Sequence, residues 1–240
     1  MENIYIIFSF LFGVCFGSFI TLASYRLPKN EDIFIKKSYC PKCKKPLKFF
    51  SLIPIFSWIF QKGKCSMCSN KISIRYPLTE ITTAILFILS YLKFGANLNT
   101  VLFDLIIVVC LIMFITDLET YTLPDSLQIS LFLLSLLFIY NNNFDIFYSV
   151  LSSFCYFVLI YLVALIVSKW KKKDALGGGD LKFITVAGLI LGIYHITIFL
   201  FLSGLIGVGF GLIWKKVKKN EYYPFAPALI ISFLLLIFFM

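Results

Sequence analysis

Long apolar runs recur along this chain from near its first residue to its last, and they constrain the fold more than any other feature. Several are long enough to cross the hydrocarbon core of a bilayer, which takes about 20 helical residues. Hydrophobic residues make up 60% of the chain and charged residues 14%, against roughly a quarter charged in soluble domains. The sequence therefore predicts an all-α polytopic membrane protein without a second large soluble domain.

The apolar runs predict about eight transmembrane helices, with approximate bounds at residues 4–24, 77–92, 100–116, 127–139, 144–168, 181–194, 195–214 and 224–240. The first run lacks both a basic segment before it and a small-residue cleavage site after it. We therefore interpret it as a retained helix rather than a signal peptide. The run at residues 183–214 is ambiguous, because it fits either one very long helix or a hairpin around Gly192.

Basic residues gather in three loops and predict the topology. Of the 22 lysines and arginines, 12 lie at residues 26–75, five at 169–182 and four at 215–219. The positive-inside rule assigns these loops to the cytoplasm, and a hairpin at 183–214 is then needed to keep the last two on the same side. In this topology the loop at 117–125 also faces the cytoplasm, and both termini face outward.

The net charge of +10 has a simpler explanation than nucleic-acid binding. The charges lie in short loops beside membrane helices, where topology and anionic lipid headgroups account for them. No nucleic-acid recognition module accompanies the charge, so the expected partner is the lipid bilayer and not nucleic acid.

Four of the seven cysteines form two C-x-x-C pairs in the first basic loop, separated by 21 residues. Four thiolates that converge on one ion in a closed tetrahedral site favour structural zinc, so we expect a cytoplasmic zinc-ribbon-like loop. Redox dithiols are an alternative, as are disulfides if the loop lies outside. The apolar stretch at residues 49–58 is expected at the membrane interface or against the helices. The proposed ligands are Cys40, Cys43, Cys65 and Cys68.

The other three cysteines, Cys15, Cys110 and Cys155, each lie alone in an apolar run. We expect them to be buried as small apolar side chains.

Two acidic residues lie beside apolar runs, where placing a charged carboxylate in a membrane costs free energy. Asp117 follows an apolar run, and Asp180 ends the stretch Gly177–Gly179 before another run begins. If the two meet, they can share a proton, so that one acts as a base on water while the other donates to a scissile carbonyl. The glycines would permit unusual backbone torsions and close approach of a substrate. The alternatives are a lysine-paired carboxylate at a helix end and a flexible glycine linker.

The only histidine does not fit this chemistry. His195 lies near the predicted outer tip of the hairpin, away from the two acids, so we interpret it as an interfacial residue.

Together these motifs resemble the bacterial type IV prepilin peptidase family, also called leader peptidase and N-methyltransferase, over nearly the whole chain. The matching elements are Gly17-Ser18-Phe19, Arg26-Leu27-Pro28, the two cysteine pairs with Ile53-Pro54-Ile55 and Ser57-Trp58 between them, Ile74-Arg75-Tyr76-Pro77 with Glu80, Asp117 through Leu123-Pro124-Asp125, and Gly177 through Asp180 with Lys182. One departure is Phe225-Ala226-Pro227, where many relatives carry F-G-P, and it puts the local backbone geometry in question.

The resemblance implies a membrane aspartic protease of the G-x-G-D type with Asp117 and Asp180 as its catalytic pair. It would act at the cytoplasmic face of the bacterial inner membrane on a type IV prepilin or pseudopilin precursor. Residues 1–25 would form the first transmembrane helix, 26–76 the cysteine loop and 77–240 the protease core. Residues expected to contact substrate or support the pair, unless they form structural pairs, are Gly177, Gly179, Lys182, Asp125 and Glu80.

Relatives with this cysteine loop often also methylate the new amino terminus with S-adenosylmethionine. No glycine-rich nucleotide-binding motif in the sequence points to that cofactor, so its expectation comes from the resemblance alone.

Three other readings stay open. A proton-coupled transporter would place its acids near the bilayer midplane, whereas these are predicted at one face. A protease of the presenilin type would lack the cysteine loop and the R-L-P element. A zinc-dependent docking protein remains an alternative if the two aspartates lie too far apart to cooperate.

Overall fold

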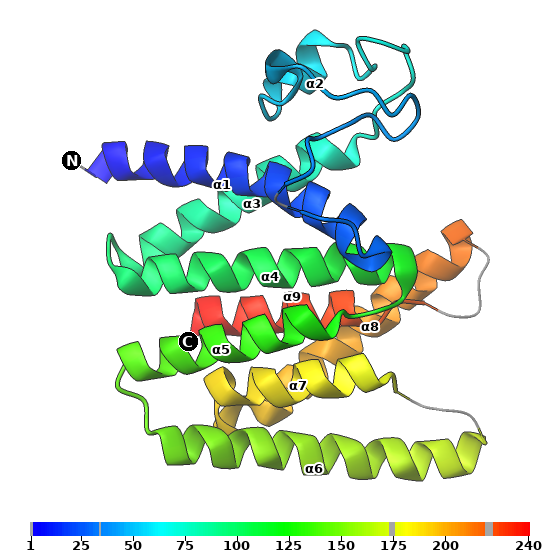
Figure 1. Cartoon of the computed structure of the whole chain (residues 1–240). Coiled ribbons are helices and arrows are strands. Elements are labelled where there is room, and N and C mark those ends of the chain that lie inside the picture. The colour runs from blue at the N-terminus through cyan, green and yellow to red at the C-terminus, as the bar shows by residue number, and fades with distance from the viewer. Residues whose placement is uncertain (1, 34, 173–175, 219–222) are drawn as a thin grey trace. The chain divides into compact units, whose positions relative to one another are not determined.

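The computed structural model describes residues 2–33, 35–172, 176–218 and 223–240, and its regular elements are helices (Figure 1). Lys173 and Lys219, which belong to two of the predicted basic loops, lie outside these residues. The chain forms two compact units, residues 1–100 and 101–240. The helices are α1 (Glu2–Arg26), η1 (Leu27–Lys29), η2 (Phe49–Ser51), α2 (Phe56–Phe60), α3 (Arg75–Phe94), α4 (Leu98–Thr120), α5 (Asp125–Asn141), α6 (Ile146–Lys171), α7 (Gly178–Leu191), η3 (Ile193–His195), α8 (Ile196–Lys218) and α9 (Ala226–Phe239).

Five helical segments are long and apolar enough to cross a membrane, which confirms the predicted class of multi-pass helical protein. They are Glu2–Lys29, Arg75–Phe94, Leu98–Thr120, Ile146–Trp170 and Ile193–Val217, and α5 and α9 are shorter apolar helices. Each of the eight predicted segments falls on a separate helix. The count of about eight membrane crossings is not confirmed and stays a prediction.

The ambiguous run at residues 183–214 is two helices, as the hairpin reading predicted. The α7 helix ends at Leu191 and α8 begins at Ile196, with a φ of 68° at Gly192 between them. Glycine adopts this left-handed region without the steric cost that a side chain brings. Figure 1 shows the chain reversing direction at this point. His195 lies in η3, between α7 and α8, with its Nδ1 2.7 Å from the carbonyl oxygen of Leu191.

Within residues 1–100, α1 and α3 cross with their backbones in contact. A Cβ built on Gly13 would lie 2.5 Å from the Cα of Ala84, and one built on Gly17 would lie 2.5 Å from the Cα of Glu80. Small residues four positions apart allow membrane helices to approach this closely. Gly17 of the G-S-F element therefore fixes the position of Glu80 on α3.

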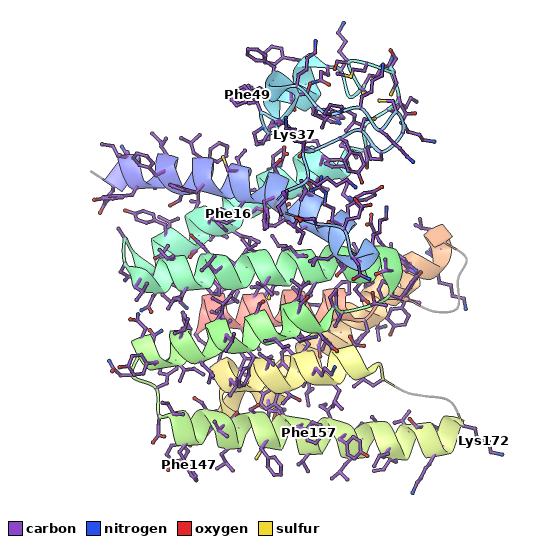
Figure 2. All side chains as sticks on the ribbon, viewed as in Figure 1. Phe16, Lys37, Phe49, Phe147, Phe157 and Lys172 are labelled. Atoms are coloured by element: carbon purple, nitrogen blue, oxygen red, sulfur yellow. The ribbon has the colours of Figure 1, made fainter. Side chains whose placement is uncertain are left out.

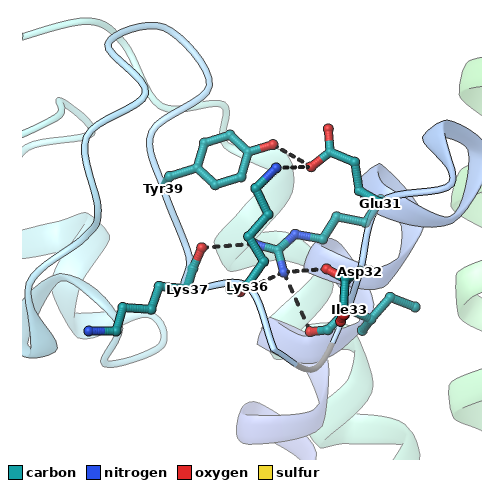
Figure 3. A network of polar contacts seen from close by, with 7 residues as sticks. Glu31, Asp32, Ile33, Lys36, Lys37 and Tyr39 are labelled. Atoms are coloured by element: carbon teal, nitrogen blue, oxygen red, sulfur yellow. Dashed lines mark hydrogen bonds and ion pairs between the residues drawn. The ribbon is translucent and has the colours of Figure 1, made fainter.

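Arg26 anchors the start of the cysteine loop, and the loop residues that it contacts are labelled in Figure 3. The residue is 2% exposed, and its guanidinium donates hydrogen bonds to the carbonyl oxygens of Asp32 at 2.9 Å, Ile33 at 3.4 Å, Lys36 at 2.8 Å and Lys37 at 3.0 Å. A buried charge is tolerated only when its hydrogen-bonding groups are satisfied. The arginine of the R-L-P element therefore stabilises the conformation of the loop.

Within residues 101–240, α7 packs against α5, α6 and α9 (Figure 1). Hydrogen bonds join it to α6, because the Ser152 hydroxyl donates to the Gly188 carbonyl at 2.9 Å and the Ser153 hydroxyl donates to the Thr185 carbonyl at 2.6 Å. Serine side chains commonly bond across helices in apolar surroundings. These contacts fix α7, and with it the position of Asp180 near its first residue.

Large apolar side chains cover the outside of several helices. Phe147 and Phe157, labelled along α6 in Figure 2, are both exposed. In a membrane protein such side chains face lipid rather than water. The same environment explains a wrong prediction: Cys110 is buried as expected, but Cys15 is exposed on α1 and Cys155 is only half-buried on α6. Their apolar neighbours in sequence reflect contact with lipid rather than burial inside the protein.

Candidate active site and metal centre

Asp117 lies in α4, three residues before the helix ends, and is only 6% exposed. Its Oδ2 accepts a hydrogen bond at 3.2 Å from the backbone N–H of Ala226, the first residue of α9. The first N–H groups of a helix have no partner inside the helix, and they favour a negative charge. The start of α9 therefore presents a hydrogen-bond donor to the Asp117 carboxylate.

The contact of Ala226 with Asp117 was not predicted from the sequence. The sequence has F-A-P where many relatives have F-G-P, which put the local backbone geometry in question. Asp117 bonds to the backbone N–H at this position, and alanine and glycine both provide that group. Pro227 could have indicated that a helix starts here, because proline near the start of an apolar run is typical of the first turn of a helix.

Asp180 is the third residue of α7, and its carboxylate accepts a hydrogen bond from the backbone N–H of Gly177, the N-cap residue. A side chain that reaches back to the N-cap in this way forms half of a capping box. A Cβ on Gly177 would lie 3.3 Å from Asp180 Oδ2, so the glycine leaves room for the carboxylate.

The expectation of unusual torsions in the glycine stretch is wrong. Gly177 has an ordinary extended backbone, with φ of −69° and ψ of 143°, and Gly178 and Gly179 are already helical. Gly179 serves instead for close packing, because a Cβ there would lie 3.0 Å from the Cβ of Leu123.

The two acidic motifs meet at the start of α7. Besides the contact of Gly179 with Leu123, the Gln128 side-chain amide donates to the Gly179 carbonyl at 3.1 Å. Lys182 Nζ lies 2.6 Å from Asp125 Oδ1 in an exposed ion pair. The L-P-D element that follows Asp117 thus contacts the glycines and the lysine on either side of Asp180.

The two carboxyl groups also interact electrostatically. Burial, and after it the nearby Asp117 carboxylate, raise the pKa of Asp180 to about 7, against the opposing hydrogen bond from Gly177. Asp180 lies outside the five candidate membrane spans. The charge of one acid therefore favours the protonated form of the other.

Glu80, the other acidic residue that the motifs singled out, lies in the first compact unit. It is buried on α3 and accepts hydrogen bonds from the Ile55 backbone N–H at 2.6 Å and from the Ser18 side chain. Glu80 therefore fastens the cysteine loop to α1 and α3.

The four cysteines of the C-x-x-C pairs form one cluster, with all four sulfur atoms within 4.8 Å of one another. The Sγ atoms of Cys40 and Cys68 are 3.9 Å apart. Zinc–sulfur bonds of about 2.3 Å in a tetrahedron separate the sulfurs by roughly 3.8 Å. The cluster therefore fits a tetrahedral metal ion such as zinc.

The two C-x-x-C turns have the same backbone hydrogen bonds. In the first turn, the Cys40 N–H donates to the Lys45 carbonyl at 3.0 Å, and the Lys44 N–H donates to the Cys40 carbonyl at 2.8 Å. In the second turn, the Cys65 N–H donates to the Asn70 carbonyl at 2.8 Å, and the Ser69 N–H donates to the Cys65 carbonyl at 2.9 Å. This repetition presents the sulfurs of both turns to a common point.

Between the two turns, the apolar stretch is mostly outward-facing. Phe49, labelled in Figure 2, and its neighbour Phe50 are 76% and 79% exposed. Trp58 instead turns inward and donates its indole N–H to the Ile72 carbonyl at 3.2 Å. The exposed rings are available to a membrane surface.

Comparison with known proteins gives matches along most of the chain. The family model described as the bacterial peptidase A24 N-terminal domain matches residues 11–94, and that of the type IV leader peptidase family matches residues 105–212. A protein of Bacillus subtilis (strain 168) is 33% identical and one of Neisseria gonorrhoeae 32%; each alignment covers 92% of this chain, and 88% and 85% of those proteins.

A third relative, from Vibrio cholerae, is 29% identical over 99% of this chain and 98% of its own length. All three are described as prepilin leader peptidase/N-methyltransferase. No solved structure matches the chain.

Proposed function

Because this chain belongs to the type IV leader peptidase family, we propose that it cuts the leader from type IV prepilins with the acid pair Asp117 and Asp180. It is a prepilin leader peptidase and N-methyltransferase that crosses the membrane several times. The observation that supports the assignment of the pair is that the two acidic motifs meet at the start of α7, where Gly179 packs against Leu123 and accepts a hydrogen bond from Gln128.

In the proposed reaction, ionised Asp117 accepts a proton from a water molecule that attacks the scissile carbonyl carbon. Protonated Asp180 donates its proton to the carbonyl oxygen, which gives a tetrahedral diol. The diol then collapses as Asp117 passes its proton to the leaving amine and one hydroxyl of the diol returns a proton to Asp180. The Ala226 N–H favours the charged form of Asp117, and the raised pKa of Asp180 favours its protonated form. Water, acid and base suffice for this reaction without a metal ion.

The site would lie at the cytoplasmic face of the bacterial inner membrane, in a protein with about eight crossings. The basic loops support this orientation through the positive-inside rule. A prepilin or pseudopilin has a hydrophobic helix behind a short basic leader, so its helix can enter from lipid while the leader junction stays at the cytoplasmic surface. Gly177 would leave room for the Asp180 carboxylate, Gly179 would let α7 pack closely against Leu123, and the Lys182–Asp125 pair would position the start of α7.

We further propose that the ion in the four-cysteine cluster is zinc with a structural role, because a closed set of four sulfurs has no position for a reacting water. The methyl donor for the new amino terminus would be S-adenosylmethionine, as expected for this family.

The test is co-expression with a prepilin, comparing the natural chain with Asp117→Asn and Asp180→Asn. Each change keeps the side-chain shape but removes the ability to ionise, so we expect leader cleavage to fall by at least about 1,000-fold while membrane insertion is unchanged. Cleavage is measured by the mobility shift of the prepilin, and insertion by the amount of full-length protein in membranes.

Asp145→Asn is the matched control. Asp145 caps α6 by accepting hydrogen bonds from Phe147 and Tyr148, and asparagine caps helices equally well. This variant should cleave like the natural chain. Substantial cleavage by both Asp117→Asn and Asp180→Asn would refute the proposed pair and mean that other residues carry out the cleavage.

A further inference from the structure

Gln128 is a buried amide in the largely apolar helix α5. It lies three residues after the helix begins and is only 5% exposed. Its Nε2 donates a hydrogen bond to the Gly179 carbonyl of α7 at 3.1 Å, and the two helices lie side by side (Figure 1). Its Oε1 is buried and has no hydrogen-bond partner among the described residues. Buried polar atoms are nearly always bonded, so this amide requires an explanation.

We propose that Gln128 is a positioning residue for leader cleavage, which holds the start of α7 so that Asp180 stays beside Asp117. The inference rests on the proposed acid pair and adds a residue that lies outside the sequence motifs of the two acids. Gln128 acts through Gly179 and needs no contact with the substrate.

The contact fixes the peptide group to which Asp180 belongs. The Gly179 carbonyl and the Asp180 N–H are parts of one planar peptide unit. A hydrogen bond that holds the carbonyl oxygen therefore orients the backbone from which the Asp180 side chain projects. Only the nitrogen of the Gln128 amide can donate to a carbonyl, so the contact also fixes which way the amide is turned.

The start of α7 needs a contact of this kind from outside the helix. Gly178 and Gly179 are its first two residues, and glycine is a poor helix former. Helix ends fray, and a first turn built from glycines opens more easily than the turns that follow. Asp180 lies in this first turn, so its position depends on what the turn is attached to.

The other contacts at this place hold the carbonyl less well. The side chains of the Lys182–Asp125 ion pair are 56% and 72% exposed, so water screens their attraction. Leu123 packs against Gly179, but an apolar contact has no preferred direction. The bond from Gln128 is directional and its side chain is buried, so it contributes most to the orientation of this turn.

The unpaired Oε1 distinguishes a positioning residue from one that serves stability alone. A buried acceptor without a partner destabilises a fold. Methionine has nearly the same length and no such oxygen, so Gln128→Met removes the destabilising atom together with the donor. The Gly179 carbonyl keeps a partner, because a carbonyl inside an α-helix accepts the N–H four residues later. A residue that served stability alone would therefore be replaced by methionine without loss.

The test compares thermal unfolding with cleavage of a prepilin peptide, both in the purified full-length protein in detergent micelles. We expect Gln128→Met to unfold at the same temperature as the natural chain or higher. Its kcat should fall by about tenfold or more while KM stays within about threefold, because a misplaced catalytic group slows the reaction without weakening substrate binding. Backbone amides at residues 178–183 should exchange with deuterium about tenfold faster than in the natural chain.

Two further variants complete the design. Gln128→Asn keeps an amide on a side chain that is one methylene shorter, so the bond to Gly179 is lost and kcat should fall as in Gln128→Met. Gln61 is the only other glutamine of the chain and lies in the other compact unit. Gln61→Met makes the same chemical change there and should keep the kcat of the natural chain within about twofold.

A natural kcat in Gln128→Met would overturn the proposal. So would a clearly lower unfolding temperature of this variant, because Gln128 would then serve the fold, and so would a raised KM at natural kcat, because Gln128 would then bind the substrate. Asp180→Asn belongs in the same series. If it cleaves normally, the acid pair fails and this inference fails with it. If it is inactive while Gln128→Met keeps its kcat, only the inference fails.

Discussion

At the scale of single residues, each carboxylate of the acid pair lies beside the start of a helix. Asp117 accepts a hydrogen bond from the Ala226 N–H of α9, and Asp180 accepts one from the N–H of Gly177, the N-cap residue of α7. The sequence could predict both acids, because carboxylates beside apolar runs are costly without a function. It could not predict the Ala226 contact, since a backbone N–H has no side-chain signature and its partner is 109 positions away.

The pair should give leader cleavage a characteristic pH dependence. The pKa of Asp180 is raised to about 7, so its proton is present below that pH and is lost as the pH rises through it. Since the proposed reaction needs that proton, kcat/KM should fall about tenfold per pH unit above roughly pH 8. The measurement is a pH series with a prepilin peptide in detergent micelles.

Asp145→Asn should show the same alkaline decline as the natural chain, because that residue lies at the cap of α6. A rate that stays constant up to pH 10 would contradict the assignment of Asp180 as the proton donor.

At the scale of helices, small residues decide the close contacts. The periodicity of apolar residues predicted where helices lie, and Gly192 was correctly predicted to separate α7 from α8. The periodicity did not show which helices touch. In a membrane protein the side chains that face lipid are as apolar as those buried between helices, so the sequence does not distinguish the two. Gly13 and Gly17, four residues apart on α1, were the available signal for the crossing with α3.

Gly17→Ala should destabilise the first compact unit. The added Cβ would lie 2.5 Å from the Cα of Glu80, so the two backbones must separate, at a cost of about 1–3 kcal/mol. The variant should therefore melt at a lower temperature than the natural chain when thermal unfolding is followed in detergent.

Gly204→Ala is the comparison for this change, because it lies inside α8 with no other atom within 4 Å of the new Cβ. It should be neutral or stabilise by up to about 1 kcal/mol through helix propensity. An equal melting temperature for Gly17→Ala and the natural chain would mean that α1 and α3 do not need this contact.

At the scale of the whole molecule, the chain divides into a unit with the cysteine cluster, residues 1–100, and a unit with the acid pair, residues 101–240. The spacing of Cys40, Cys43, Cys65 and Cys68 predicted the cluster, because two C-x-x-C turns converge readily on one ion. A cavity of about 390 Å³ in the first unit could not be predicted, since its walls combine α1, the loop and α3, and no single motif encodes that combination.

The division predicts that zinc loss spares part of the leader cleavage. Cys40→Ser removes one of four ligands, so bound zinc should fall by about tenfold or more, and the loop should become sensitive to proteases. Part of the leader cleavage should be retained, because both aspartates lie in the other unit. Zinc is measured by elemental analysis of purified protein, and cleavage by mass spectrometry of the product.

Cys15→Ser replaces an exposed cysteine of α1 outside the cluster and should leave zinc content unchanged. A full complement of zinc in Cys40→Ser would show that the four sulfurs do not share one ion.

The anchoring of Arg26 has a consequence for biosynthesis. All four of its carbonyl partners lie within 11 positions, so this contact can close while the chain is still emerging from the ribosome. The cysteine cluster bridges 28 positions between Cys40 and Cys68, and the bond between Ile55 and Glu80 has to wait for α3. We therefore expect the contacts of Arg26 to form first during synthesis, metal binding by the four cysteines second, and the bond between Ile55 and Glu80 last.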